Sequence, residues 1–127
     1  MFEPVGAFEV IAEALKSDEE ICGLQVGPDS YVLMGNAASD RKKYFCFYQD
    51  EMLKAYIQFG EAIIGVFHSH PNGRTTPSST DLEFHSPGKN LIIIADRKMY
   101  NYGDPTRPNA ADPISEDPGT VGNPYTL

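Results

Sequence analysis

Apolar residues recur along the first hundred positions with two spacings, one typical of helices and one typical of strands. The helical spacing of three and four residues occurs over residues 8–16 and again over residues 50–60. In the second segment, Asp50 is suited to cap the amino end and Gly60 to end the helix. The pattern therefore predicts two amphipathic helices in the first half of the chain.

Shorter apolar runs predict strands. A turn at residues 28–29 joins the first two runs into a hairpin. The runs at residues 63–68 and 91–95 are uninterrupted, which is typical of strands buried on both faces. Between them, the sequence predicts a loop over residues 71–77 and a short helix over residues 78–84. The predicted strands are residues 20–26, 31–34, 44–48, 63–68, 91–95 and 98–102. This order predicts an α/β domain with a central mixed sheet flanked by helices.

The character of the chain changes after residue 102. Residues 103–127 hold five prolines and four acidic residues but almost no large aliphatic side chains. Such a segment buries too little apolar surface to offset the entropy lost on ordering. We therefore expect a domain over residues 1–102 and a Pro-rich acidic tail or linker over residues 103–127. The alternative is an extended arm that packs on the domain through Ile114, Val121 and Tyr125.

Composition and charge exclude several classes of protein. A length of 127 residues suits one domain, and 18 acidic against 10 basic residues give a formal charge of −8. This balance argues against nucleic acid and anionic membrane as partners. The apolar runs are too short to cross a bilayer, and the amino terminus lacks a signal-peptide pattern. Cys22 and Cys46 form no CxxC pair, so we expect two free thiols and a cytoplasmic location.

The candidate chemistry lies directly after the run at residues 63–67. Residues i and i+2 of a strand point to the same side, so His68 and His70 can aim their imidazoles at one point. Pro71 ends the strand, and the following loop lets Asp81 return from the next helix. Two imidazoles and one carboxylate suit a catalytic zinc site, which keeps a fourth position for water. Ser78 and Asp81 also match a helix capping box, and this interpretation is compatible with the first.

A zinc-bound water needs a base that is not itself a ligand, and Glu20 is the candidate. It precedes the apolar residues 21–24 at the start of a predicted strand. A carboxylate at such an edge is either a solvated strand terminus or a functional acid, and the sequence pattern alone leaves both open.

These residues together resemble the JAMM motif of the JAB1/MPN+ metalloproteases, an upstream glutamate followed by H-[ST]-H-P-x6-S-x2-D. Every position of the motif is present, and the resemblance covers about residues 8–102. It implies a JAB1/MPN-type fold with layers like those of cytidine deaminases. It also implies that His68, His70 and Asp81 hold one Zn²⁺ and that Glu20 moves the proton of the zinc-bound water. Ser78 would donate a hydrogen bond to the oxyanion.

The resemblance extends to the type of enzyme. The short segments at residues 28–43 and 73–77 are similar to those of compact prokaryotic and phage members. The opening EEICGLQVG at residues 19–27 and the proline-rich end fit the phage or prophage type. We therefore expect a zinc metallopeptidase of the phage or prophage tail-assembly type, acting on a peptide or isopeptide bond of a protein or peptide substrate. One alternative is a processing or deconjugating peptidase for the tails of ubiquitin-like or sulfur-carrier proteins. Another is a non-catalytic, metal-bearing binding module. The sequence specifies no oligomeric state.

Two other metal enzymes share part of this pattern. A zinc deaminase needs H-x-E and P-C-x-x-C, and neither is present. An iron oxygenase uses two histidines and one carboxylate but gives no role to Glu20 or Ser78. Because the ligand set is complete without it, we expect His85 beside the site or at the surface. We expect Cys22 and Cys46 in the core, with Cys22 on the same side of its strand as Glu20.

Overall fold

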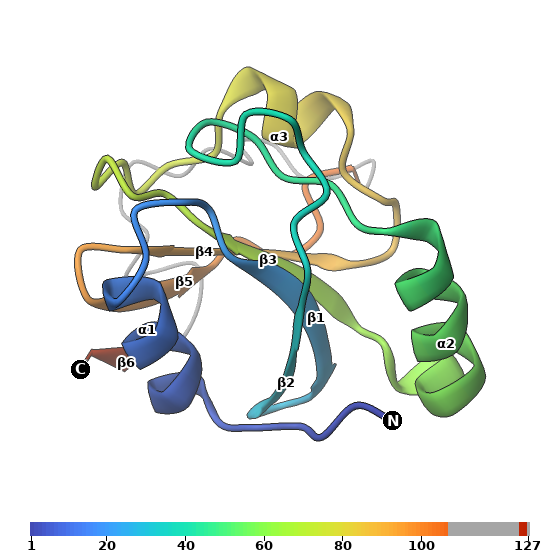
Figure 1. The fold of residues 1–127 in the computed structure, drawn as a ribbon. Helices are drawn as coiled ribbons and strands as arrows, with labels where there is room; N and C mark the ends of the chain where they lie inside the picture. Colours follow the sequence, from blue (N-terminus) through green and yellow to red (C-terminus); the bar gives the residue numbers. More distant parts are fainter. Residues whose placement is uncertain (107–124, 127) are drawn as a thin grey trace.

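A computed structural model of the chain describes residues 1–106 and 125–126, and a mixed β-sheet forms its centre (Figure 1). The elements are α1 (Ala7–Leu15), β1 (Cys22–Gly27), β2 (Ser30–Met34), α2 (Gln49–Phe59), the 3₁₀ turn η1 (Gly60–Ala62), β3 (Gly65–Ser69), α3 (Ser79–Glu83), β4 (Asn90–Ala95), β5 (Lys98–Asn101) and β6 (Tyr125–Thr126). Within the described residues the strand order is β2-β1-β3-β4-β5-β6. Only the β3–β4 pair of this sheet is parallel. The predicted α/β class is confirmed.

Helices cover both faces of the sheet because successive strand residues alternate between the faces. Ile11 of α1 packs with Phe67 on one face. Ala55 of α2 packs with Leu24 on the other face. His68 follows Phe67 in β3 and therefore points away from α1. In Figure 1, α1 and α3 lie on opposite sides of the sheet, so His68 faces the side of α3.

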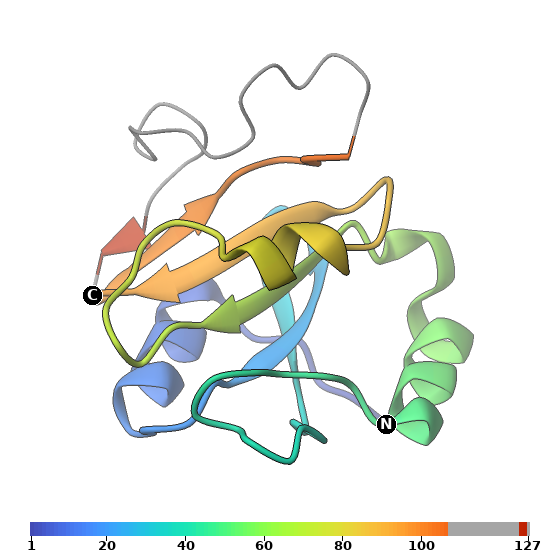
Figure 2. The ribbon, with the colours of Figure 1, turned by 90° about the horizontal axis from the view of Figure 1, so that it is seen from above.

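The segment between β3 and β4 carries the face of the molecule on which the site lies. The chain leaves β3, forms a loop and α3, and returns as β4 parallel to β3. Seen from above, α3 lies across β3 and β4, and the segment between β2 and α2 runs beside it (Figure 2). These two segments therefore border the end of β3 that holds the histidines.

Close packing at the centre of the sheet depends on Gly23. It pairs with Phe67 across β1 and β3, and the Phe67 ring lies over its Cα. A Cβ atom at position 23 would lie 1.9 Å from the Val32 carbonyl oxygen and 2.4 Å from the Phe67 ring. Only glycine therefore lets the Phe67 ring reach the α1 face of the core.

Most predicted elements are confirmed with shifts of one or two residues at their ends. Gly60 ends α2 with φ of 53°, a left-handed conformation that glycine adopts easily. The helix starts at Gln49 with Tyr48 as its cap, so the prediction that Asp50 caps it is wrong. Asp50 lies instead in the first turn, where a negative charge also favours a helix amino end.

The strand predicted over residues 44–48 is wrong. Within the segment, only a single bridge between Asn36 and Phe47 has strand pairing. The Asn36 side chain donates to the carbonyl of Tyr44 and accepts from the amide of Cys46, so these backbone groups are bonded without a sheet. Cys46 is exposed, so the expectation that it lies in the core is wrong as well.

The carboxyl-terminal prediction is only partly within the described residues. Residues 125–126 form β6 beside β5, with Thr126 opposite Lys98. Ile114 and Val121, named above for an extended arm, lie outside the described residues, and a boundary at residue 102 stays a prediction. Among the described residues, no helix has the length and hydropathy needed to span a membrane.

Candidate metal centre

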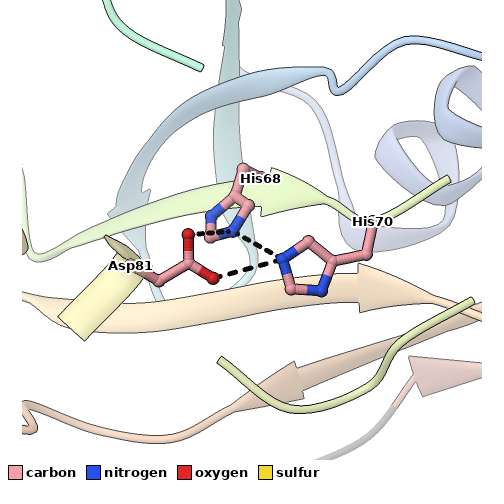
Figure 3. A group of neighbouring side chains, drawn as sticks. All are labelled: His68, His70 and Asp81. Atoms are coloured by element: carbon pink, nitrogen blue, oxygen red, sulfur yellow. Dashed lines mark hydrogen bonds and ion pairs between the residues drawn. The ribbon is translucent and has the colours of Figure 1, made fainter. Parts of the chain in front are cut away.

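Two elements bring His68, His70 and Asp81 together. His68 lies in β3, and His70 follows it, with its amide donating to the Ile94 carbonyl at 2.9 Å. Asp81 lies in the first turn of α3. Figure 3 shows the three side chains pointing toward one another from the strand end and the helix. The alternation of strand side chains thus places the two imidazoles as the sequence predicted.

A complete capping box holds Asp81 in place. The Ser78 hydroxyl oxygen accepts a hydrogen bond from the Asp81 amide at 3.0 Å. The Asp81 carboxylate accepts one from the Ser78 amide at 2.8 Å. The capping and metal-site interpretations of this pair are therefore both compatible with the structure, since the cap fixes the helix start that presents the carboxylate.

The spacing of the three donors suits a single small cation. His68 Nε2 lies 3.1 Å from His70 Nε2 and 3.1 Å from Asp81 Oδ1. His70 Nε2 lies 3.2 Å from Asp81 Oδ2. Ligands about 2.0–2.1 Å from a tetrahedral zinc ion are separated by about 3.3–3.4 Å. The residues present therefore fit zinc, and they form a group that could hold a metal ion.

The hydrogen bonds of His70 also indicate that a proton or a cation belongs between this histidine and Asp81. His70 Nδ1 lies 2.8 Å from the Arg74 carbonyl, which can only accept, so Nδ1 carries the proton. Neutral His70 then presents the lone pair of Nε2 to the Asp81 carboxylate, which is also an acceptor. A proton or a metal ion between these two acceptor atoms would satisfy both lone pairs.

The pKa shifts of the three side chains also indicate that positive charge is favoured beside Asp81. Burial favours neutral Asp81, yet hydrogen bonds from His68 and His70 outweigh it and hold the pKa of Asp81 well below its ordinary value. Burial opposes a charged His70, but its contacts with Asp81 and Arg74 outweigh burial and raise its pKa. Burial lowers the pKa of His68. The site is thus built around an ionised Asp81 and attracts positive charge.

Glu20 lies beside this group. It is 7% exposed, and its backbone is held by hydrogen bonds to the Arg41 carbonyl and from the Asn36 side chain. Together with His70 and Ser78, it lines a cavity of about 200 Å³. The alternative of a solvated strand terminus is therefore wrong, and β1 begins two residues later at Cys22.

The environment of Glu20 suits proton transfer. Burial raises its pKa from 4.5 to about 7; the charge of His70 lowers the pKa, and those of Asp81 and Asp40 raise it. A carboxyl group with a pKa near neutrality can both take up and release a proton at physiological pH.

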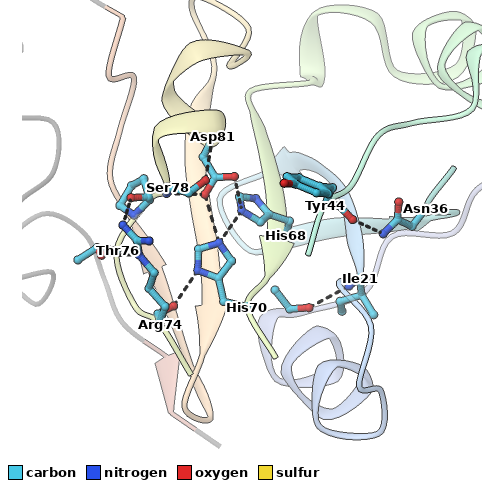
Figure 4. A network of polar contacts seen from close by, with 11 residues as sticks. Ile21, Asn36, Tyr44, His68, His70, Arg74, Thr76, Ser78 and Asp81 are labelled. Atoms are coloured by element: carbon cyan, nitrogen blue, oxygen red, sulfur yellow. Dashed lines mark hydrogen bonds and ion pairs between the residues drawn. The ribbon is translucent and has the colours of Figure 1, made fainter. Parts of the chain in front are cut away.

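Several neighbours hold the site together. Ser69 points to the opposite side from the histidines, and its hydroxyl oxygen accepts a hydrogen bond from the Ile21 amide at 2.9 Å. Figure 4 shows the bond at Ile21, the bond of Asn36 to Tyr44 and the bond between His70 and Arg74. Ser69 therefore has a structural role, since it ties β3 to the residue after Glu20.

Cys22 and His85 lie near the site but outside the donor group. Cys22 is buried opposite His68, with Sγ 3.6 Å from the Gly35 carbonyl oxygen. His85 is half-buried, and its Nε2 lies 2.6 Å from the Lys89 carbonyl oxygen. The expected positions of Cys22 in the core and of His85 beside the site are confirmed.

The sequence interpretation missed Phe45. Its ring stacks on the His68 imidazole, with centroids 4.5 Å apart and planes inclined by 20°. It lies in the segment predicted as a strand, and no spacing pattern in the sequence links it to a histidine 23 residues away.

His68 Nδ1 is buried and has no hydrogen-bond partner among the described residues.

Comparison with known proteins gives two findings. A family model described as prokaryotic homologues of the JAB domain matches residues 6–108. The solution structure of a protein from Desulfitobacterium hafniense is similar, with a TM-score of 0.58 and 23% sequence identity over 75% of this chain and 78% of that one. At this identity the likeness shows the fold alone. No curated protein matches the chain.

Proposed function

Because the chain belongs to the prokaryotic homologues of the JAB domain, we propose that it is a zinc-dependent peptidase that hydrolyses a peptide or isopeptide bond. The observation that carries the proposal is the position of Glu20. A buried carboxyl group with a pKa of about 7 shares a cavity with His70, beside three donors that fit zinc. Metal, base and open space are the elements that water-mediated hydrolysis requires.

Each residue has a role that follows from its surroundings. His68, His70 and Asp81 would hold the metal, and a bound zinc ion would lower the pKa of water toward about 7. Glu20 would accept a proton from the attacking water and pass it to the leaving amine. Asp81 cannot serve as this base, because both its oxygens already contact the histidines.

Ser78 is suited to stabilise the oxygen that becomes negative during the attack. Its hydroxyl oxygen accepts the capping hydrogen bond from Asp81 through a lone pair. The hydroxyl proton is therefore left to be donated toward the same cavity that Glu20 lines. One such donor is worth about 2.7–4 kcal/mol in the transition state.

The biological setting is proposed from features of the sequence. The short segments at residues 28–43 and 73–77 favour a compact prokaryotic or phage enzyme. The opening EEICGLQVG and the proline-rich end favour the phage or prophage tail-assembly type, in the cytoplasm and acting on a protein or peptide substrate. The alternative is processing of ubiquitin-like or sulfur-carrier protein tails. The sequence encoded downstream distinguishes them, because a second peptidase domain supports tail assembly and a natural stop supports a free-standing enzyme.

The test compares the wild-type chain with Glu20→Gln after zinc loading and gel filtration. Elemental analysis should give about one zinc per chain for both proteins, because Glu20 is not a donor. Wild type should cleave members of a mixed library of linear and isopeptide-linked peptides. Glu20→Gln should be slower by about 10²-fold or more.

Glu19→Gln is the matched control, since it makes the same chemical change at the neighbouring residue. Glu19 forms an exposed ion pair with Arg41, which contributes little to stability. This variant should keep both zinc and cleavage. Bound iron with oxygen consumption would favour the oxygenase instead, and bound zinc without cleavage by wild type would leave the non-catalytic, metal-bearing binding module.

A further inference from the structure

A second cavity borders the metal centre, and its walls are largely apolar. Its volume is about 450 Å³. Phe45, Phe47 and Phe84 contribute aromatic rings, and Val66 and Leu91 contribute aliphatic side chains from the sheet. Pockets of this size and lining are typical of sites that bind small molecules or side chains.

This aromatic cavity shares walls with the donor group. His68 and Asp81 line it, and Phe45 stacks on the His68 ring. A group bound in the aromatic cavity would therefore lie directly beside the metal ligands. Leu53 and Ile57 of α2 are also exposed apolar residues, but neither lines this cavity.

The cavity that Glu20 lines has the opposite character. It is smaller, about 200 Å³, and its lining includes the cationic side chains of Lys42 and Arg74, which do not line the aromatic cavity. Lys43 and Ser78 line both cavities. Glu20 is not among the residues that line the aromatic cavity. A substrate chain that crosses the metal centre would meet polar, basic surroundings on one side and apolar rings on the other.

We propose that the aromatic cavity receives a large apolar side chain of the substrate, from a residue that flanks the cleaved bond. The inference rests on the proposed peptidase function and names the feature of the substrate that this site selects. Phe84 supports it, because its ring is 76% exposed at the edge of the cavity and gains burial when an apolar side chain enters. A cavity of this volume accepts an aromatic side chain but is too small for a folded partner.

Two substitutions change the aromatic cavity in opposite ways without touching a donor. Phe84→Ala removes one aromatic wall, and Ser86→Trp fills the space from an exposed position. Leu53→Ala is the matched control, because Leu53 is an exposed apolar residue on α2, 62% accessible, that does not line the cavity.

Binding is measured first and does not depend on turnover. N-acetyl-L-phenylalaninamide is titrated into the full-length, zinc-loaded chain and followed by amide NMR. The signals of residues 45, 47 and 84 should shift in wild type and in Leu53→Ala but not in Ser86→Trp. N-acetylglycinamide should leave them unchanged. Equal shifts with both compounds, or shifts that persist in Ser86→Trp, would overturn the inference.

Cleavage is measured second, with peptide pairs that carry Phe or Gly beside the bond identified by mass spectrometry. Wild type should prefer Phe by about 10–100-fold in kcat/KM. Phe84→Ala and Ser86→Trp should each reduce this ratio by about fivefold or more, and Leu53→Ala should preserve it. Cleavage without an apolar preference would overturn the inference and leave the peptidase. Binding without any cleavage would overturn the peptidase function and leave an apolar binding site.

Discussion

One hydroxyl group, that of Ser78, belongs to the helix cap and is also the proposed hydrogen-bond donor to the oxyanion. Its oxygen accepts from the Asp81 amide, while Asp81 accepts from the Ser78 amide. Removing the hydroxyl group takes away one of these two bonds but leaves the backbone amide of residue 78 bonded to the carboxylate. The position of Asp81, and with it the metal, should therefore depend on Ser78 less than catalysis does.

We predict that Ser78→Ala keeps about one zinc per chain and loses about 10²–10³ in kcat, the cost of one oxyanion donor. Loss of the cap should lower the free energy of unfolding by about 1 kcal/mol. Elemental analysis, steady-state kinetics and urea unfolding measure the three quantities. An unchanged kcat would remove Ser78 from the mechanism, and loss of zinc would assign it to metal binding.

The two cysteines should differ sharply in reactivity. Burial raises the pKa of Cys22 from 9.0 to about 12, with smaller contributions from Cys46, Glu51 and Glu20, whereas Cys46 is exposed. The thiolate is the reactive form. At pH 8 iodoacetamide should therefore modify Cys46 and leave Cys22 intact until the chain unfolds, as peptide mass spectrometry would reveal. Labelling of Cys22 in the folded chain at a comparable rate would contradict this environment.

The same shift gives a pH dependence of stability. The folded-state pKa of Cys22 lies above its unfolded value, so the folded chain retains the proton more strongly. The contribution of Cys22 to the free energy of unfolding is complete below pH 9 and is lost as the pH rises from about 9 to 12. Cys22→Ala should weaken this alkaline loss of stability in urea unfolding experiments, with Cys46→Ala as the control.

Residue chemistry could be predicted from the sequence where short-range geometry determines it. His68 and His70 share a side because strand residues alternate, and Ser78 presents Asp81 because a capping box has one geometry. The burial of Glu20 and the stacking of Phe45 on His68 could not be predicted from the sequence, because both depend on chain segments that are distant in sequence.

At the scale of elements, β3 and α3 form the unit that carries the site. The strand supplies two donors at its end, and the short helix returns the third before the chain continues as β4. The antiparallel pairing of β1 with β3 places the chain before Cys22 next to the histidine end, because Cys22 lies opposite His68. This register brings Glu20 to the metal centre.

The strands β3 and β4 were predictable because their apolar runs are continuous. The structure of residues 44–48 was not predictable in this way, because their aromatic composition favours a strand that does not form. Its backbone groups bond to the Asn36 side chain, and the rings of Phe45 and Phe47 pack edge to face near His68. Tertiary contacts thus replaced the sheet pairing that local propensity predicted.

We predict that Gly23→Ala destabilises the chain by about 3 kcal/mol or more, because the added methyl group meets the Val32 carbonyl and the Phe67 ring. The strain would act through the β1–β3 pair and so weaken zinc binding too. Gly6→Ala is the control, since its Cβ would meet only Asp29 at 3.5 Å. Urea unfolding compares the two, and equal stability would show that the sheet adjusts around position 23.

At the scale of the whole molecule, the metal centre connects elements that otherwise pack separately. α1 packs on one face of the sheet and α2 on the other, whereas α3 contributes no residue to these two clusters. Asp81 of α3 contacts His68 of β3 and His70, which follows that strand. Bound zinc should therefore stabilise the folded chain and the position of α3 together.

We predict that zinc raises the melting temperature of the chain and that chelation reverses the change. A ligand at about 1,000 times its Kd adds about 4 kcal/mol, which corresponds to about 10 °C or more for a domain of this size. His70→Ala should abolish the increase because it removes a donor. His85→Ala should retain it, since His85 lies outside the donor group.

Calorimetry with and without zinc measures each difference within one protein, so a general loss of stability in a variant does not affect the comparison. An equal increase in wild type and His70→Ala would mean that zinc binds elsewhere, and the three donors would then lose their proposed role.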